Sequence, residues 1–243
     1  RMMVIKGEGG EGKSQIGAVL AKLFGRNMKD GSIGKISENR FARADLEHIL
    51  LCVDDDMRME ALRQTNYVKS IVTAQGKMDL ERKGQQSYQG WMFARLLAFS
   101  NGDLQALFDH SNGFYRRQLV LTTKDRPADR VDDPELAEKM KEEAEGILLW
   151  AVEGLQRLVA NNFHFTESRR TRENRETVKR SSNNVFDFLE SQGYVRLKAD
   201  ASASSKELYE AYQIYCTENN LPPLKPRSFS EALIACQSRY KLE

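Results

Sequence analysis

The sequence predicts an α/β fold with a mostly parallel sheet, a β-hairpin insertion and a small helical unit at the C-terminal end. Three observations predict it. A glycine-rich loop follows the apolar run 2–5, and two further apolar runs, 46–53 and 91–99, end in polar residues. Continuous apolar runs are typical of strands that a parallel sheet buries on both faces. From about residue 185 onward the pattern changes to short amphipathic segments.

The glycine-rich loop at residues 7–14 (GEGGEGKS) fits the phosphate-binding pattern G-x-x-x-x-G-K-[ST]. Its glycines allow a tight turn that aims successive N–H groups at an anion, and a helix predicted over 15–24 adds its positive dipole end. In this pattern Lys13 contacts the β- and γ-phosphates, and the Ser14 hydroxyl holds Mg²⁺. An ordinary glycine-rich turn is the alternative. The predicted contacts of the bound nucleotide are Gly7, Glu8, Gly9, Gly10, Glu11, Gly12, Lys13, Ser14 and Gln15.

A second strand is predicted over 33–36, and a third over 46–53 ends in Asp54, Asp55 and Asp56. Ligands of parallel sheets bind at the carboxyl edge of the strands, so these acids are expected beside the loop as a Walker B motif. We expect Asp54 to position Mg²⁺ and Asp55 to orient or polarise the attacking water. Which of the three acids activates water stays open. The alternative is an acidic turn after a core strand.

The stretch 70–88 alternates apolar and polar residues around two glycines, which predicts a β-hairpin with basic residues at or near its tip. Lys77, Arg82 and Lys83 are the candidate contacts to DNA phosphates. A solvated hairpin without a ligand is the alternative.

The apolar run 91–99 is a strand candidate that closes near Asn101. An Asn at this edge either senses hydrolysis, by bonding the γ-phosphate or the attacking water, or simply ends the strand. Arg116 and Arg117 precede a strand predicted over 118–122. If they point away from their own loop, they serve a neighbouring subunit as an arginine finger. As plain surface residues they have no role.

A long helix is predicted from Asp133, because an N-cap carboxylate followed by Pro134 opens helices well. Apolar residues then recur every three or four positions as far as Leu158, which predicts one face packed on a core. The arginine-rich run 167–180 is interpreted as a solvated helix or a DNA contact.

Two capping-box pairs, Ser204 with Glu207 and Ser228 with Glu231, open helices in the tail. Three short helices there predict a helix-turn-helix or winged-helix unit, which either contacts DNA or serves as a structural cap.

The composition excludes several classes of protein. The net charge of +2 is nearly neutral, three scattered cysteines form neither a disulfide framework nor a zinc site, and no apolar run approaches a membrane span. We therefore expect a cytoplasmic protein with reduced cysteines. Because residue 1 is Arg rather than Met, we also expect the chain to be the C-terminal piece of a longer protein.

The order of these motifs resembles the superfamily 3 DNA helicases of the AAA+ type. Within them it is most similar to the helicase half of phage, plasmid and poxvirus primase-helicase proteins, and the likeness covers nearly the whole chain. The motifs that carry it are the phosphate loop, Asp54-Asp55, the basic hairpin with Lys83, Ser100-Asn101, the segment 113–117 (GFYRR) and a winged-helix-like tail over 207–233. The resemblance implies an AAA+ ATPase domain over 1–165, a charged helical linker over 166–184 and a winged-helix-like domain over 185–243.

Members of that family assemble into hexameric rings, with ATP bound between subunits and hairpins lining a DNA channel. Carried over by position, the resemblance implies the following roles: ATP and Mg²⁺ on Lys13 and Ser14, metal and water on Asp54 and Asp55, a sensor at Asn101, a finger at Arg117 or Arg116, and DNA on Lys83.

The sequence therefore predicts an ATP-dependent replicative DNA helicase of a phage or mobile element, acting in the cytoplasm of a bacterial host. The expected partners are single-stranded DNA, replication forks, further copies of the chain in a hexameric ring and a primase domain or subunit, without a membrane. The alternatives are a P-loop kinase acting on a small molecule and an origin-binding initiator ATPase without unwinding activity.

Overall fold

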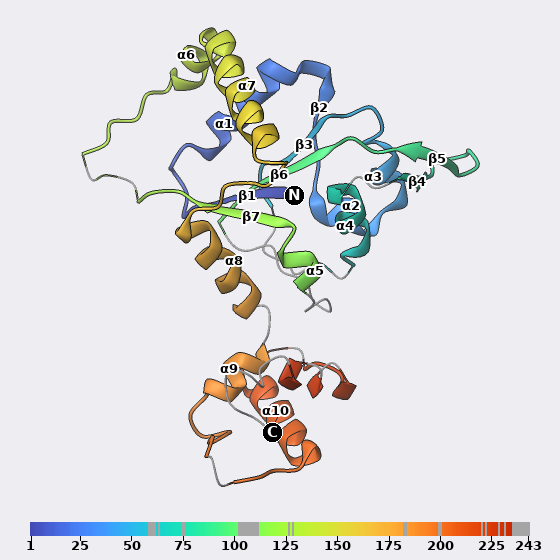
Figure 1. Ribbon diagram of the computed structural model, residues 1–243, viewed down its shortest axis with the longest axis vertical. Helices are drawn as coiled ribbons and strands as arrows, with labels where there is room; N and C mark the ends of the chain where they lie inside the picture. Colours follow the sequence, from blue (N-terminus) through green and yellow to red (C-terminus); the bar gives the residue numbers. More distant parts are fainter. Residues whose placement is uncertain are drawn as a thin grey trace. The chain divides into compact units, whose positions relative to one another are not determined.

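The computed structural model describes most of the chain. The described residues are 1–57, 62, 64–73, 76–101, 112–125, 127, 129–181, 184–198, 201–219, 221, 223–227, 229–230 and 232–234, without the side chains of 112 and 179–181. The chain forms two compact units, Arg1–Glu176 and Thr177–Glu243 (Figure 1). The first holds a central sheet, and the second is helical.

The central sheet has five strands in the order β2-β3-β6-β1-β7, and every neighbouring pair is parallel. This confirms the predicted α/β fold with its mostly parallel sheet. β1 lies between β6 and β7, so the loop that follows it opens from the interior of the carboxyl edge. The strands are β1 (Met2–Lys6), β2 (Met28–Asp30), β3 (Leu51–Asp54), β6 (Arg95–Ser100) and β7 (Gln118–Thr122).

Helices pack on the sheet through apolar side chains. Leu20 and Phe24 of α1 (Lys13–Phe24) pack on a buried cluster of β3 and β6 that is formed by Leu51, Val53, Leu97 and Phe99. α4 (Asn66–Thr73) packs against β6, and it contacts α2 as well. The remaining short elements of this unit are η1 (Gly25–Asn27), α2 (Ile33–Glu38), α3 (Arg40–Ala44) and α5 (Asn112–Tyr115).

The second strand is not where the sequence predicted it. Residues 33–36 belong to α2, and the strand is the preceding segment Met28–Asp30. Ser32 decides this, because its hydroxyl accepts a hydrogen bond from Lys35 N and caps the helix. The strand predicted over 46–53 is also shorter, since Leu46–Ile49 make turns and β3 begins at Leu51.

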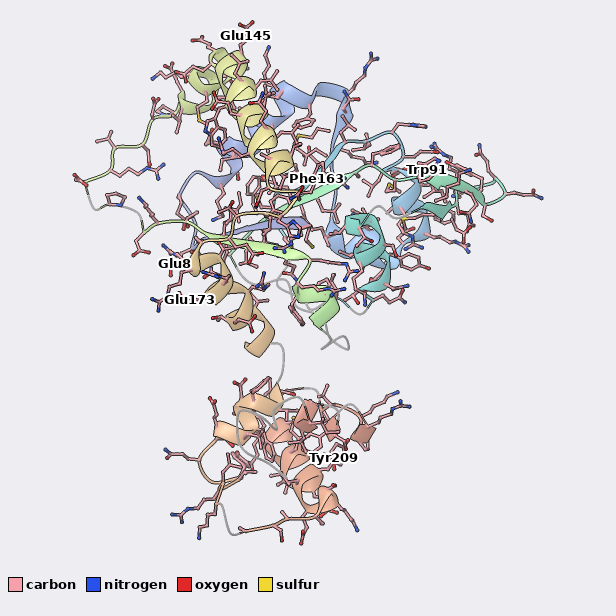
Figure 2. All side chains as sticks on the ribbon, viewed as in Figure 1. Glu8, Trp91, Glu145, Phe163, Glu173 and Tyr209 are labelled. Carbon is pink, nitrogen blue, oxygen red and sulfur yellow. The ribbon has the colours of Figure 1, made fainter. Side chains whose placement is uncertain are left out.

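A β-hairpin is present, as predicted, but it starts later. Residues 70–73 are the last turn of α4, and the hairpin pairs β4 (Lys77–Leu80) with β5 (Tyr88–Trp91) in antiparallel register. The run 91–99 is consequently divided, because Trp91 ends β5 while β6 starts at Arg95. Trp91, labelled in Figure 2, stays 52% exposed at the base of the hairpin.

The helix predicted from Asp133 is two helices, α6 (Leu136–Glu142) and α7 (Ala144–Ala160). Glu143 leaves helical geometry between them. The predicted core face is only partly covered: Leu136, Ile147 and Leu158 are half-buried, whereas Leu148 and Leu155 expose 52% and 55% of their surface, and neither helix has a fully buried residue. The spacing was that of an amphipathic helix, and α1 contacts both helices but leaves part of their apolar face exposed.

α8 (Arg169–Ser181) lies against β7, the edge strand of the sheet. Asn174 Nδ2 donates to Val120 O at 3.1 Å, and Arg170 Nη2 donates to Thr123 O at 3.3 Å. These bonds satisfy backbone carbonyl groups of β7 and of the residue that follows it. In an uncovered edge strand, such groups can pair with a strand of another molecule. α8 therefore protects this edge of the sheet.

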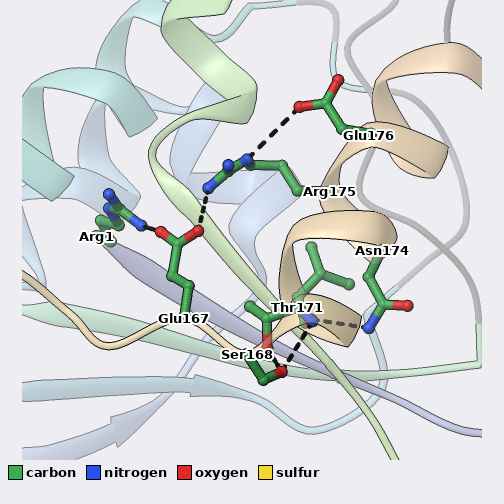
Figure 3. A network of polar contacts seen from close by, with 8 residues as sticks. Arg1, Glu167, Ser168, Thr171, Asn174, Arg175 and Glu176 are labelled. Atoms are coloured by element: carbon green, nitrogen blue, oxygen red, sulfur yellow. Dashed lines mark hydrogen bonds and ion pairs between the residues drawn. The ribbon is translucent and has the colours of Figure 1, made fainter.

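A polar network joins the start of the chain to α8 (Figure 3). The Glu167 carboxylate accepts hydrogen bonds from Arg1 and, at 2.8 Å, from Arg175 Nη1. The Ser168 hydroxyl accepts from Thr171 N at 3.1 Å and so caps α8. The network holds the helix beside the N-terminal strand.

The second unit is built on α9 (Asn184–Glu190) and α10 (Ser205–Glu218). The predicted capping box of Ser204 and Glu207 is present at the start of α10. Tyr212 stacks on Phe229 with ring centroids 4.6 Å apart, and its hydroxyl donates to Asn184 Oδ1 at 2.6 Å. Aromatic rings and aliphatic side chains such as Val185 and Leu189 together form the core of this unit.

A winged helix is not confirmed, because the described residues of this second unit include no β-strand. The capping pair Ser228 and Glu231 lies outside the described residues. Across the described part of the whole chain, none of the helices is long and apolar enough to cross a bilayer.

Replacement of Leu97 by Ala tests the packing of α1 on the sheet. Leu97 is 6% exposed, and its truncation should lower the free energy of unfolding by about 2–5 kcal/mol. Both tryptophans lie in the first unit, so their fluorescence in a urea titration measures this effect. Leu155→Ala, at a residue 55% exposed, is the control and should change the value by less than about 0.5 kcal/mol. If Leu97→Ala and Leu155→Ala lowered the free energy of unfolding equally, the packing of α1 on Leu97 would be contradicted.

Candidate functional site

The phosphate loop connects β1 to α1 and has the backbone that its glycines allow. Gly9, Gly10 and Gly12 have φ values of 115°, 75° and 88°, which side chains of L-residues rarely adopt. Gly7 N donates to Ser100 O at 3.0 Å, so the loop is fastened to the end of β6. The sequence pattern and the strand order together place the loop at the carboxyl edge of the sheet.

The polar groups of the loop converge on one carboxylate of the loop itself. The Glu11 carboxylate accepts hydrogen bonds from Glu8 N, from Gly9 N at 2.9 Å and from Lys13 Nζ at 2.8 Å. The bond from Lys13 is the main reason that the pKa of Glu11 is lowered to about 2. The loop is therefore folded as an anion cradle, with the side chain of Glu11 as the anion.

Lys13 joins the loop to the neighbouring strand. Its Nζ also donates to Asn101 Oδ1 at 3.3 Å, directly after the end of β6. Because β6 pairs with β1 in parallel, the two strands end side by side. Asn101 thus lies beside Lys13 at the carboxyl edge of the sheet.

An open cleft of about 640 Å³ lies beside the loop. Residues 9–15 of the loop and α1 line the cleft, together with Asp55, Asp56 and Asn101. The sequence predicted all of these but not Arg130, Asp132 and Asp133, which also line the cleft. They lie in a polar segment after β7 that carries no nucleotide-binding motif. Because this segment leaves the sheet at the carboxyl edge of β7, the strand order alone could have indicated a place at the cleft.

Asp54 has a different environment from its two neighbours. It does not line the cleft, exposes only 7% of its surface, and accepts a hydrogen bond at Oδ2 from Ile33 N at 2.7 Å. Burial, with a smaller effect of the negative charges of Asp56 and Asp55, raises its pKa. A buried carboxylate destabilises a fold unless a cation or several donors compensate it.

The residues present fit a nucleotide and Mg²⁺. The cradle already accepts a carboxylate, which occupies the place of an anionic ligand, and the Ser14 and Asp55 oxygens line the same cleft. Hydroxyl, carboxylate and phosphate oxygens are the ligands that Mg²⁺ prefers. Within the described residues, no group of three or more His, Cys, Asp or Glu side chains holds a metal by itself. Mg²⁺ would therefore need oxygens from the nucleotide or water.

The two arginines lie at the other edge of the sheet. Arg116 and Arg117 precede β7, and β7 runs parallel to β1, so the length of the strands, roughly 13 Å, separates them from their own loop. Arg117 Nη1 donates to Gly113 O, and its buried Nε has no hydrogen-bond partner among the described residues. Arg116 is exposed. Of the two, Arg116 is the more exposed, and Arg117 is half-buried.

The basic hairpin residues also differ from one another. Arg82 donates to Glu47 Oε2 at 2.8 Å and to the Tyr88 hydroxyl at 3.1 Å, and these bonds raise the pKa of its guanidinium. Arg82 thus fastens the hairpin to the body of the unit. Lys77 and Lys83 are exposed and make no ion pair among the described residues, so they are available to a ligand.

Two family models match parts of the chain. A family of unknown function (DUF5906) matches residues 5–117, and the family described as poxvirus D5 protein-like matches residues 180–238. A search of curated proteins finds no match. The first match contains the phosphate loop, the hairpin and both arginines, whereas the second falls within the tail.

Solved structures are similar in fold at low sequence identity. The apo structure of the NrS-1 C terminal region has 14% identity and a TM-score of 0.52, over 79% of this chain and 48% of its own. The A form of that region has 18% identity and a TM-score of 0.47, over 60% and 34%. The X-ray structure of JCV helicase has 12% identity and a TM-score of 0.39, over 93% and 57%. The chain thus spans between a third and three fifths of these chains.

Replacement of Asp54 by Asn tests the cost of its burial. Because the folded pKa is raised, Asp54 favours the fold most below its unfolded pKa of about 3.9, and this contribution is lost as pH rises through the folded value. Asp54→Asn should therefore melt at a higher temperature than wild type at pH 8, and the difference should shrink as pH falls towards about 4. Melting curves across this range measure the effect.

The control is Glu38→Gln, an exposed carboxylate on α2 that should leave the melting temperature nearly unchanged at each pH. If Asp54→Asn lowers the melting temperature at pH 8, Asp54 stabilises the fold in its ionised form, which would contradict this account.

Proposed function

We propose that this chain is the motor part of a replicative DNA helicase, which hydrolyses ATP at contacts between subunits and moves along single-stranded DNA. The observation that carries the proposal is the anion cradle, in which the loop N–H groups and Lys13 already surround a negative charge while Lys13 touches Asn101. Such a cradle at the start of a helix is a binding site for phosphates.

The side chains of the cleft have separate roles in this proposal. The loop and Lys13 bind the phosphates, and Ser14 holds the metal with the acidic residues. Asp55, on the wall of the cleft, orients the attacking water, and Asn101 bonds the γ-phosphate until it leaves. Mg²⁺ supplies charge neutralisation on the phosphate oxygens when bound.

Arg116 requires a second subunit. It is exposed at the amino edge of the sheet, whereas its own phosphate loop is at the carboxyl edge. A neighbouring copy in a ring would bring Arg116 to the next cleft, where a guanidinium stabilises the charge of the transition state. Loss of the γ-phosphate then shifts the contact between subunits and moves the hairpin.

The hairpin supplies the contact to DNA. Arg82 and the exposed Lys83 both lie in the turn that joins β4 and β5, and the bond of Arg82 to Glu47 fastens this turn to the rest of the unit. An ammonium group contacts phosphates without reading bases, so weak sequence preference and strong salt dependence are expected. The poxvirus D5 protein-like match supports the same family, since it falls on the tail whose sequence resembles poxvirus primase-helicase proteins.

Steady-state ATP hydrolysis is the first test. Activity should rise when single-stranded DNA is added and, per molecule, should rise with protein concentration because the sites are shared. Lys13→Ala should lower it by at least about a hundredfold, since the phosphate loses its charged partner. Activity indifferent to both DNA and concentration would overturn the proposal and favour a small-molecule kinase. Unwinding of a forked duplex separates a helicase from an initiator ATPase.

Replacement of Lys83 by Ala tests the hairpin. Affinity for a labelled oligo-dT should fall about three- to tenfold at low salt, and the slope of log affinity against log salt should decrease by about 0.7. Fluorescence anisotropy at several salt concentrations measures both quantities. Lys22→Ala removes an exposed charge at the end of α1 and should change neither. If Lys83→Ala and Lys22→Ala had the same affinity for oligo-dT and the same salt slope, Lys83 would not contact the DNA.

A further inference from the structure

The phosphate loop contains two glutamates that behave differently. Glu8 is exposed and its side chain makes no hydrogen bond among the described residues, whereas the Glu11 side chain exposes only 9% of its surface. Glu11 turns back into the loop and accepts bonds from Glu8 N, from Gly9 N at both of its oxygens, and from Lys13. These donors are the ones that a bound phosphate requires in this kind of loop.

The carboxylate and a phosphate cannot occupy the cradle together. Both groups are anionic, and the N–H groups of Glu8 and Gly9 can donate to only one of the two groups at a time. Lys13 Nζ, at 2.8 Å from Glu11 Oε2, is in reach of the same position. A ligand must therefore displace the side chain of Glu11 before its phosphate is bound.

We propose that Glu11 is a specificity-determining residue of the site, a built-in competitor that admits only ligands with enough phosphate groups to displace it. This inference rests on the proposed function, since it assumes that the loop takes a nucleotide. A single phosphate accepts few hydrogen bonds from the cradle beyond those that the Glu11 carboxylate already accepts. Its exchange for the carboxylate therefore gains little binding free energy. A nucleoside triphosphate offers further oxygens to Lys13, to Ser14 and to a metal, and these additional bonds drive the exchange.

Protonation does not open the cradle under ordinary conditions. The pKa of Glu11 is about 2, so its carboxylate is ionised at every pH at which the protein is expected to work. Release depends on the competing anion alone. The bond between Lys13 and Asn101 belongs to the same arrangement, so displacement of Glu11 frees Lys13 to follow the phosphate while Asn101 stays beside it.

The test compares wild type, Glu11→Gln and Lys13→Ala by calorimetric titration with inorganic phosphate, inorganic pyrophosphate and MgATP. Gln keeps the size of the side chain but removes the charge that holds Lys13. Glu11→Gln should bind pyrophosphate and MgATP about tenfold or more tightly than wild type, because no charged hydrogen bonds are lost on exchange. It should also gain measurable affinity for phosphate. Lys13→Ala should bind none of them well.

Glu142→Gln is the matched control, since it removes an exposed charge on the nearby helix α6 and should leave all affinities within about twofold. Thermal melting verifies folding, and Glu11→Ala replaces the Gln variant if that variant does not fold. If Glu11→Gln binds pyrophosphate and MgATP no more tightly than wild type, while wild type needs Lys13 to bind MgATP, Glu11 is not a competitor of the ligand. The proposed function would still stand in that case. Failure of wild type and Glu11→Gln to bind either pyrophosphate or MgATP overturns both.

Discussion

The convergence of the loop donors on one anion is the interaction on which the rest of the site depends. The N–H groups of Glu8 and Gly9 and the ammonium of Lys13 all point at one position, and they can do so only because the neighbouring glycines adopt positive φ angles. Such a concentration of donors is costly without an anion, and in this chain Glu11 provides one. The loop conformation is thus held by hydrogen bonds to its own side chain.

The parallel sheet makes this arrangement possible. β1 lies between β6 and β7, so the loop is flanked by the end of β6, which anchors Gly7 and carries Asn101. The next strand, β3, ends in the buried Asp54 and leads to Asp55, which lines the cleft. Because β7 runs parallel to β1, Arg116 lies at the amino edge of the sheet, opposite to the edge that carries the phosphate loop. The strand direction thus separates the residues that line the cleft from Arg116, which in the proposed function serves a neighbouring copy.

The sequence predicted what local chemistry determines. The glycine pattern gave the loop, the apolar runs gave the buried strands, and Ser204 with Glu207 gave the start of α10. The prediction failed where contacts with other residues determine the structure. Residues 33–36 form a helix because Ser32 caps it, and the apolar spacing of α7 did not indicate how much of its apolar face another element covers. Arg130 carries no motif, and the different environments of Asp54 and Asp55 follow from Ile33 N, a donor twenty-one residues away in the chain.

The most direct test of the account is an NMR titration of the ¹⁵N-labelled chain with a slowly hydrolysed MgATP analogue. The account predicts large shifts of the Glu8 and Gly9 amide resonances as phosphate replaces the Glu11 carboxylate, with smaller shifts at Asn101 and none at Tyr212 in the second unit. Shifts that avoid the loop while the analogue is bound would contradict it, because the nucleotide would then bind without the anion cradle.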